Sequence, residues 1–466
     1  MILQVYNLLK SLKYLESFAR FIFSAPAGLT MFSKSSFTPN AGFLIIPPLL
    51  KRKLFLVKSA HLLCMALMLA PVSALQAAEK SPAALQQEAL AERDNLLATE
   101  PLWSKRISVS LDKRFVKLQS VQMDDLLYSV DWRGVIYAIE TMSGDTVWQH
   151  DVGAIVSGGL SLDSGLLLLG TSEGELIALQ PTDGTEVWRS QLSSEILSAP
   201  LVADGHVVVH SNDGYVYGLS AQNGEQLWAY QYKVPALTLR GTSVPIYAMG
   251  LVLVGLGNGK VVALDLQSGV VRWLQTVAVP RGRSELQRMV DIDATPVRVG
   301  SIIYVVSYQG RVAALDIGTG RVVWIREFSS YSGMAADSES LYLSDSEGKV
   351  SAINQATGAT LWTQGKLSGL KLTQPVISKG TLIVAADDGY LYWLATESGE
   401  LLSRTAVKEL AARLQGLEWD LWNDYDHSAL PDFYDEDIGI NVAPQPLSDG
   451  SLLVLDNQGY LTRFRH

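Results

Sequence analysis

A repeat of about forty residues constrains the fold of this chain more than any other feature. Tryptophans recur four residues after a glycine, and a second glycine lies ten residues before the first. Self-similarity at this period indicates equivalent units that bury their cores only against one another. The tryptophans are Trp148, Trp188, Trp228, Trp273, Trp324 and Trp362, with spacings of 40, 40, 45, 51 and 38 residues. The glycine pairs are Gly134/Gly144, Gly174/Gly184, Gly214/Gly224, Gly259/Gly269, Gly310/Gly320 and Gly348/Gly358.

Each unit has the pattern of four short strands. Residues 261–273 form a strand, a turn closed by Gly269, and a second strand ending in tryptophan. The preceding apolar run, residues 251–254, connects through Asn258-Gly259, a favoured hairpin turn because both residues tolerate positive φ. Residues 243–246 supply the first strand. Four strands in about forty residues is the size of a propeller blade.

The repeat count predicts an all-β, eight-bladed β-propeller of four-stranded antiparallel blades. A seventh glycine pair, Gly389/Gly399, has Leu402-Ser403 where the tryptophan would fall, and an eighth half-copy begins at Gly459. The eighth blade lacks its last strand at the C-terminus, and residues 102–107 have the character to supply it. We therefore expect the propeller to span residues 101–466 and the N-terminal strand to close the ring, which removes exposed edges.

The residues before the propeller read as targeting sequence. A basic cluster at residues 51–53 precedes an apolar run that ends in Ala74, with small residues suited to cleavage. We predict an over-extended N-terminus over residues 1–56, a signal peptide over 57–74 and a linker over 75–100. The alternative is a genuine extension that anchors in or crosses a membrane. Cleavage after Ala74 leaves 29 basic and 46 acidic residues, a net charge of −17.

Composition excludes several kinds of site. The full chain carries a formal charge of −10, which disfavours a nucleic-acid groove. Its one cysteine, Cys64, permits no internal disulfide and no four-thiolate zinc site. Ser172 matches a nucleophile motif but falls on a strand-to-strand turn rather than the required strand-to-helix turn. His206 and His210 are too far apart along one strand to bind one metal. We predict no catalytic, cofactor or metal residues.

An acidic insertion interrupts the array at about residues 405–440. Residues 418–437 hold eight acids with interleaved aromatics. We interpret this stretch as a solvated acidic loop, and calcium binding is the alternative.

The two longest spacings, 45 and 51, fall in consecutive repeats. Both extra segments follow a repeat's tryptophan and precede the next blade, and such connectors leave one face of a propeller, so we expect the two segments to lie side by side. Insertions on one face of a repeat scaffold commonly form its binding surface. The candidate residues are Leu237, Leu239 and Arg240 in the first segment and Asp291 and Asp293 in the second. On spacing alone, partner binding and internal loop packing are equally supported.

The repeat resembles that of quinoprotein propellers. More narrowly, residues 100–466 resemble the BamB family of outer membrane protein assembly factors. The most specific segments are residues 235–241 (PALTLRG) and 291–296 (DIDATP). The resemblance implies that Leu237, Leu239, Arg240, Asp291 and Asp293 contact a periplasmic POTRA domain of BamA. Members are usually lipoproteins, but Leu63 before Cys64 makes a poor lipidation signal.

Two functions of different classes follow. The first is a non-enzymatic scaffold of the outer membrane assembly (BAM) complex, at the periplasmic face of the outer membrane, which also guides unfolded outer membrane proteins. The alternative is a quinone-dependent dehydrogenase on a similar propeller. The scaffold is favoured because the chain after residue 74 has no cysteine pair and its repeats hold no calcium-binding carboxylate cluster. On this basis Asp291→Lys with Asp293→Lys is expected to weaken BamA binding and to leave thermal unfolding nearly unchanged.

Overall fold

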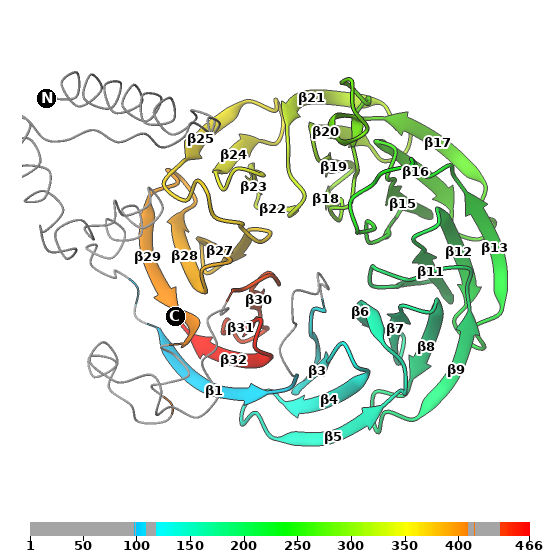
Figure 1. The fold of residues 1–466 in the computed structure, drawn as a ribbon, viewed down its shortest axis with the longest axis vertical. Coiled ribbons are helices and arrows are strands. Elements are labelled where there is room, and N and C mark those ends of the chain that lie inside the picture. Colours follow the sequence, from blue (N-terminus) through cyan, green and yellow to red (C-terminus); the bar gives the residue numbers. More distant parts are fainter. Residues whose placement is uncertain (1–96, 98, 109–117, 409–413, 415–438) are drawn as a thin grey trace, which may run out of the picture. The chain divides into compact units, whose positions relative to one another are not determined.

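The computed structural model describes residues 97, 99–108, 118–408, 414 and 439–466. They form eight four-stranded antiparallel sheets arranged around a central axis, so the predicted eight-bladed propeller is confirmed (Figure 1). In blades 1 to 7 the strands follow chain order from the axis to the rim. Blade 8 has the order β30-β31-β32-β1, with its outer strand taken from the other end of the chain.

The blades are numbered in chain order. Blade 1 contains β2 (Val121–Met123), β3 (Leu126–Val130), β4 (Val135–Glu140) and β5 (Thr146–Asp151); blade 2 contains β6 (Val156–Asp163), β7 (Leu166–Thr171), β8 (Glu175–Leu179) and β9 (Glu186–Gln191). Blade 3 contains β10 (Leu201–Ala203), β11 (His206–His210), β12 (Tyr215–Ser220) and β13 (Gln226–Gln231); blade 4 contains β14 (Ile246–Ala248), β15 (Leu251–Gly255), β16 (Lys260–Asp265) and β17 (Val271–Thr276). Blade 5 contains β18 (Val297–Val299), β19 (Ile302–Val306), β20 (Gly310–Asp316) and β21 (Val322–Phe328); blade 6 contains β22 (Met334–Ala336), β23 (Ser340–Ser344), β24 (Val350–Asn354) and β25 (Thr360–Gln364). Blade 7 contains β26 (Val376–Ser378), β27 (Thr381–Ala385), β28 (Tyr390–Ala395) and β29 (Leu401–Ala406); blade 8 contains β30 (Gln445–Pro446), β31 (Leu452–Leu455), β32 (Tyr460–Arg465) and β1 (Glu100–Arg106).

The hydrophobic core lies between the blades. The second strand of a blade is almost entirely buried, as in β15, because its two faces pack against the two neighbouring blades. One apolar cluster joins Val208 of β11 to Val254 of β15, and the other clusters also join adjacent sheets. Outer strands such as β13 are mostly exposed instead, and Trp228 is the one buried residue of β13.

The repeated tryptophan and the second glycine of each pair form one contact between neighbouring blades. Trp228 Nε1 of β13 donates to the carbonyl of Leu266 in blade 4 at 2.8 Å. Gly269 of blade 4 has φ +69°, and a Cβ atom there would lie 2.6 Å from the Trp228 ring. Glycine is thus required at this position for two reasons, the positive φ of the turn and the space that the tryptophan ring occupies. This Trp–Gly contact recurs for Trp103/Gly144, Trp148/Gly184, Trp188/Gly224, Trp273/Gly320, Trp324/Gly358 and Trp362/Gly399.

Blade 7 exchanges the positions of its large and small residues. In blade 4 the small Ala263 of β16 pairs across the strands with Trp273 of β17. In blade 7 the tryptophan is Trp393 of β28, and the small partner is Ser403 of β29. The Trp393 ring is fully buried and packs edge-on against Phe464 of blade 8, with centroids 6.4 Å apart. The volume of the cross-strand pair is kept, so the blade needs no tryptophan on its outer strand.

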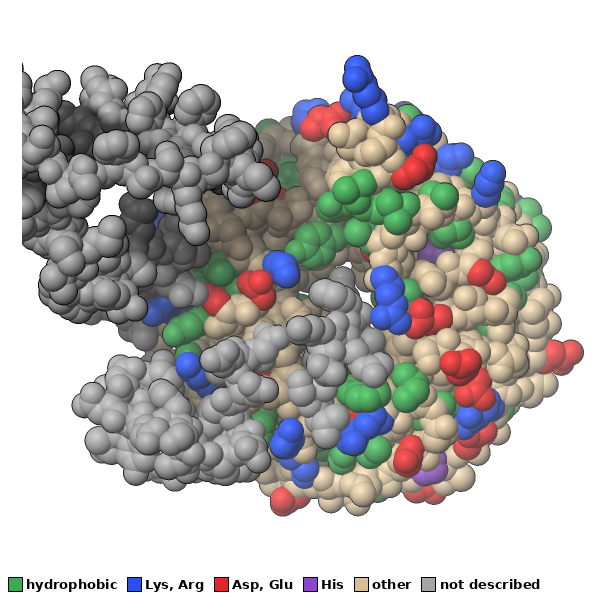
Figure 2. Space-filling model, in the orientation of Figure 1, with side chains coloured by type: hydrophobic (Ala, Val, Ile, Leu, Met, Phe, Trp, Pro, Cys, Tyr) green, Lys and Arg blue, Asp and Glu red, His purple; other side chains and the backbone are tan. Residues whose placement is uncertain are grey.

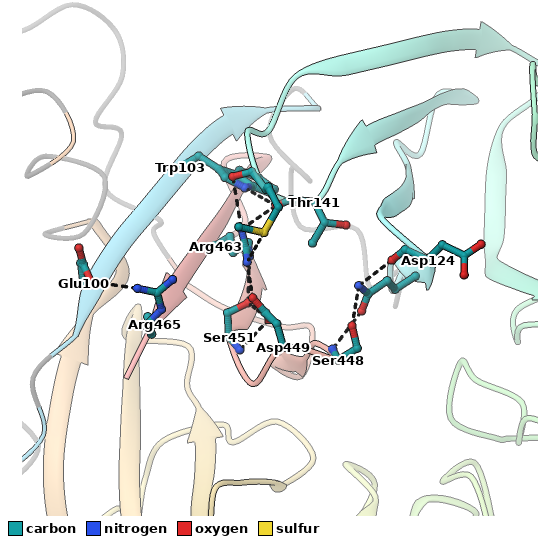
Figure 3. A network of polar contacts seen from close by, with 11 residues as sticks. Glu100, Trp103, Asp124, Thr141, Ser448, Asp449, Ser451, Arg463 and Arg465 are labelled. Atoms are coloured by element: carbon teal, nitrogen blue, oxygen red, sulfur yellow. Dashed lines mark hydrogen bonds and ion pairs between the residues drawn. The ribbon is translucent and has the colours of Figure 1, made fainter.

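Blade 8 contacts blade 1 through a buried arginine (Figure 3). Arg463 of β32 is fully buried and donates to the carbonyl of Thr141 at 2.7 Å, to Ser451 Oγ at 2.9 Å and to Asp449 Oδ2 at 2.5 Å. The same Thr141 carbonyl accepts from Trp103 Nε1 of β1 at 2.9 Å. Burial opposes ionisation of Asp449, but hydrogen bonds from Ser451 and Arg463 outweigh it and lower its pKa to about 2. That β1 holds the ring closed is a claim about stability and stays a prediction.

Connectors between blades share one face with the turns after each blade's second strand. Tyr232 N–H, just after β13, donates to the carbonyl of Gly214 in such a turn at 3.0 Å. Val277 N–H, just after β17, donates to Gly259 in the same way at 2.9 Å. The Trp–Gly contacts lie at the opposite ends of the strands. One face of the propeller therefore carries the connectors between blades, and the other carries the Trp–Gly contacts.

Candidate functional site

Two long connectors lie side by side on the connector face. The first, residues 232–245, joins β13 to β14, and the second, residues 277–296, joins β17 to β18. The carboxylate of Asp291 in the second accepts the backbone N–H of Leu239 in the first. Asp293 Oδ2 lies 3.1 Å from where a Cβ atom on Gly241 would be. The predicted adjacency of these segments is therefore confirmed, and together they are called the paired-connector surface.

The two predicted aspartates differ in exposure. Asp291 is 1% exposed, whereas Asp293 is half-buried. Burial raises the pKa of Asp291 to about 6, and the hydrogen bond from Leu239 only partly offsets that effect. As alternate residues of an extended segment, both approach the first connector from the same side.

A buried polar network lies beneath the first connector. Tyr232 OH lies 3.2 Å from His210 Nε2 and accepts the N–H of Gly257 at 3.4 Å. His210 Nδ1 is 3.3 Å from the carbonyl of Ser243, so an Nδ1–H imidazole satisfies both ring nitrogens. Burial lowers the pKa of His210 to about 4 and raises that of Tyr232 to about 12, so both are neutral at pH 7. This network fixes both ends of the first connector to blades 3 and 4.

The outward side of the first connector offers an apolar and a cationic group. Leu237 is 41% exposed, Leu239 is half-buried, and Arg240 is exposed. Arg240 Nη2 donates to Glu195 Oε1 at 2.6 Å, which ties the connector to the one between β9 and β10. Figure 2 shows hydrophobic side chains gathered next to the central opening over blades 4 and 5, with Lys and Arg side chains along the rim. Arginine is a residue type enriched in protein-binding hot spots, and the exposed leucine beside it adds apolar area that a partner can cover.

The structure thus brings all five predicted residues together but divides their roles. Leu237, Leu239, Arg240 and Asp293 are accessible in whole or part. Asp291 is buried and accepts the N–H of Leu239, so its geometry favours a role in ordering the first connector, and its assignment as a contact residue stays a prediction. Because Asp291 is buried and hydrogen-bonded, the structure favours destabilisation by Asp291→Lys over unchanged unfolding. Sequence reasoning missed Glu195, because its connector has no unusual length to draw notice.

The other candidates from the sequence lie either apart from this surface or outside the described residues. Ser172 lies in the turn between β7 and β8, as predicted. His206 and His210 are both buried in β11. Across residues 99–108, 118–408 and 439–466, no three metal-ligating side chains cluster. Cys64, the predicted signal peptide and the acidic stretch 418–437 lie outside the described residues. The helices within the described part include none long and apolar enough to cross a bilayer.

The architecture and repeat define this chain as a β-propeller of the quinoprotein-like repeat class. The family model described as outer membrane protein assembly factor BamB matches residues 133–364 and 346–459. BamB of Pseudomonas aeruginosa is 40% identical over 365 residues, covering 78% of this chain and 95% of that protein. The crystal structure of BamB from Moraxella catarrhalis superposes with a TM-score of 0.67 at 25% identity, covering 79% of this chain and all of that one. The chain belongs to the BamB family of outer membrane protein assembly factors.

A second structural likeness concerns the fold alone. A quinohemoprotein alcohol dehydrogenase from Comamonas testosteroni gives a TM-score of 0.60 at 15% identity, covering 79% of this chain and 77% of that one. Shared propeller architecture does not carry enzymatic function with it.

Proposed function

We propose that this protein is a non-enzymatic scaffold of the outer membrane β-barrel assembly machinery, which binds a periplasmic POTRA domain of BamA through the paired-connector surface. It acts at the periplasmic face of the outer membrane, after export by its signal peptide, and assists the insertion of outer membrane proteins. The observation that carries the proposal is the Asp291–Leu239 hydrogen bond, because it orders the connector that presents Leu237 and Arg240.

Rigid presentation is what supports a binding role for this surface. Leu237 remains exposed although its connector is held by Asp291 and by the Tyr232–His210 network. A preorganised exposed leucine loses little conformational entropy when a partner covers it. Arg240 is exposed but already orientated by Glu195, so its remaining donors can meet a partner's carboxylate or carbonyl.

The test is a titration of the purified periplasmic part of BamA into the mature protein. Leu237→Ala combined with Arg240→Glu is expected to weaken binding by on the order of tenfold or more, as for hot-spot residues. The matched control is Leu227→Ala with Arg272→Glu. Leu227 is also an exposed leucine, and Arg272 is also an exposed, ion-paired arginine, but both lie at the rim on outer strands. Equal affinity of the two double variants contradicts the proposed surface.

The export and enzymatic questions have separate tests. Mass spectrometry of the mature N-terminus is expected to find a chain starting at Leu75, and a lipid on Cys64 would contradict that expectation.

Adding pyrroloquinoline quinone and calcium is expected to give neither tight binding nor alcohol oxidation. Tight binding of the quinone, or oxidation of an alcohol, would favour the dehydrogenase alternative.

A further inference from the structure

The second connector also contains an exposed projection, which lies before Asp291 and Asp293 in the chain and has not been assigned a role above. Residues 279–288, of sequence VPRGRSELQR, are all exposed and include the 3₁₀ turn η2 (Leu286–Arg288). The chain on either side is buried, at Val277 and Ala278 before it and at Met289 and Val290 after it. These residues, called the arginine projection, therefore stand out from a fixed base.

The arginine projection is ordered by its own hydrogen bonds. Gln287 Oε1 accepts the backbone N–H of Arg283 at 2.9 Å and of Ser284 at 3.4 Å. Ser284 Oγ accepts the N–H of Gln287 in return, at 3.3 Å. Gly282 has φ +122°, which other residues rarely adopt. Four backbone N–H groups are thus used within the projection, since Arg288 N–H also donates to the carbonyl of Glu285, and the exposed side chains are left to contact a partner.

Its charge is opposite to that of the molecule. Arg281, Arg283 and Arg288 are exposed, and their guanidinium groups form no ion pair or hydrogen bond with any described residue. Glu285 is the one acid among them, so the projection has a formal charge of +2 on a chain whose formal charge is −10. Elsewhere Arg189, Arg240, Arg272, Arg311 and Arg463 all pair with carboxylates.

Apolar side chains accompany these arginines. Leu286 is 59% exposed and Val279 is 55% exposed. An exposed leucine between arginines has the character of an interface, because planar guanidinium groups and an apolar anchor recognise an acidic surface with a shallow apolar groove. Asp291 joins the base of the projection to the connector that bears Leu237, so both lie on one continuous surface.

We propose that the arginine projection is a second docking element for the partner of the paired-connector surface, and that it recognises an acidic, apolar-grooved part of that protein. This inference rests on the proposed function. A basic projection on an acidic molecule favours a partner with an acidic surface. The attraction between the two opposite charges also orients the proteins as they approach each other.

The experiment compares two charge-reversal variants of equal net charge. Arg281→Glu, Arg283→Glu and Arg288→Glu are combined in one, and the control combines Arg272→Glu, Arg321→Glu and Arg326→Glu, which are exposed on, or directly before, the outer strands β17 and β21. Binding of the periplasmic part of BamA is titrated at low and at physiological salt. The first variant is expected to lose on the order of tenfold or more in affinity, and most of the salt dependence, whereas the control stays close to the parent. Leu286→Ala alone is expected to weaken binding at both salt concentrations.

The outcomes separate this inference from the function on which it rests. If the parent does not bind BamA, the proposed function fails and the inference fails with it. If the parent binds and Leu237→Ala with Arg240→Glu weakens binding, but the first triple variant matches the control, only the inference is overturned. Vesicles of phosphatidylglycerol and phosphatidylethanolamine are titrated in parallel. A triple variant that loses vesicle binding while keeping its affinity for BamA also overturns it, in favour of an anionic lipid surface.

Discussion

The carboxylate of Asp291 accepts the backbone N–H of Leu239, a residue 52 positions earlier in the chain, and so joins the two connectors. Asp291 is buried, its other carboxylate oxygen has no hydrogen-bond partner among the described residues, and its pKa is raised to about 6. The bond therefore orders the candidate binding surface at a cost in desolvation. The residues proposed to bind a partner and the residue that orders the surface are adjacent here but distinct.

Asp291→Lys is expected to destabilise the protein by about 3–5 kcal/mol, since it buries an unpaired charge and leaves the Leu239 N–H without its acceptor. Asp293→Lys is expected to cost much less, because Asp293 is partly exposed. Thermal unfolding of the two single variants checks this, with hydrogen exchange of the Leu239 amide as a local measurement. Equal melting temperatures for the two variants would refute the structural role of Asp291.

The stability contributed by Asp291 depends on pH in a defined direction. Its pKa is about 6 in the folded protein and near the ordinary 3.8 when unfolded, so the folded state binds the proton more tightly. The free energy of unfolding therefore falls as pH rises from about 4 to about 6, by about 2–3 kcal/mol, and this contribution is constant above that range.

Asp291→Asn removes this dependence and keeps an acceptor for Leu239. The variant is expected to exceed the parent in stability at pH 7 and to match it near pH 4, as measured by urea unfolding. His210 contributes the opposite slope between its ordinary pKa of 6.5 and about 4, because its pKa is lowered by burial. That slope is common to parent and variant, so it cancels in their difference. A difference that does not change with pH would show that Asp291 does not titrate in this range.

The fold followed from sequence because each blade repeats the same few requirements. Within a repeat a tryptophan such as Trp273 follows its glycine, Gly269, by four residues, and this offset recurs six times. Each of the two residues then contacts the equivalent partner in a neighbouring blade, which one architecture satisfies throughout the array. In blade 7 the large and small residues of the cross-strand pair change places, and the sequence pattern shows this only as a missing tryptophan. Its replacement, Trp393, lies on the neighbouring strand, where spacing along the chain cannot reveal the cross-strand pairing with Ser403.

The candidate site was predictable in position but not in detail. Unequal repeat lengths identified both connectors, because a repeat fixes where extra residues must leave the scaffold. The burial of Asp291 depends on how one connector covers the other, which no local pattern encodes. Glu195 and His210 are likewise brought to the site by the packing of neighbouring blades. The arginine projection lies within the second connector that the repeat lengths identified. Its internal hydrogen bonds and its lack of ion pairs depend on side-chain positions, which the sequence does not give.

The Trp–Gly contact can be tested with two glycines that share a backbone conformation. Gly269 and Gly250 have φ of +69° and +78°, but only Gly269 faces the Trp228 ring, and Gly250 has no atom within reach of a Cβ. Gly250→Ala is expected to cost about 1 kcal/mol from backbone strain alone. Gly269→Ala is expected to cost several kcal/mol, because the ring or the blade must shift. Chemical denaturation of the two variants measures the difference, and similar stabilities would mean that the blades tolerate the displacement.

Whether β1 closes the ring can be decided by removing it. β1 pairs with β32 from Glu100 to Arg106, and Trp103 is buried against Gly144 of blade 1. A chain starting at residue 107 would lose that tryptophan, worth about 3–5 kcal/mol, and would leave β32 as an unpaired edge. We expect it to melt at a lower temperature and to associate with itself, in comparison with a chain starting at residue 97. A synthetic peptide of residues 99–107 is expected to restore the melting temperature, because it supplies the missing strand without covalent connection. A shortened chain that stays monomeric and melts like the longer one would show that contacts among the other strands, including that of Arg463 with Thr141, suffice to hold blade 8 to blade 1.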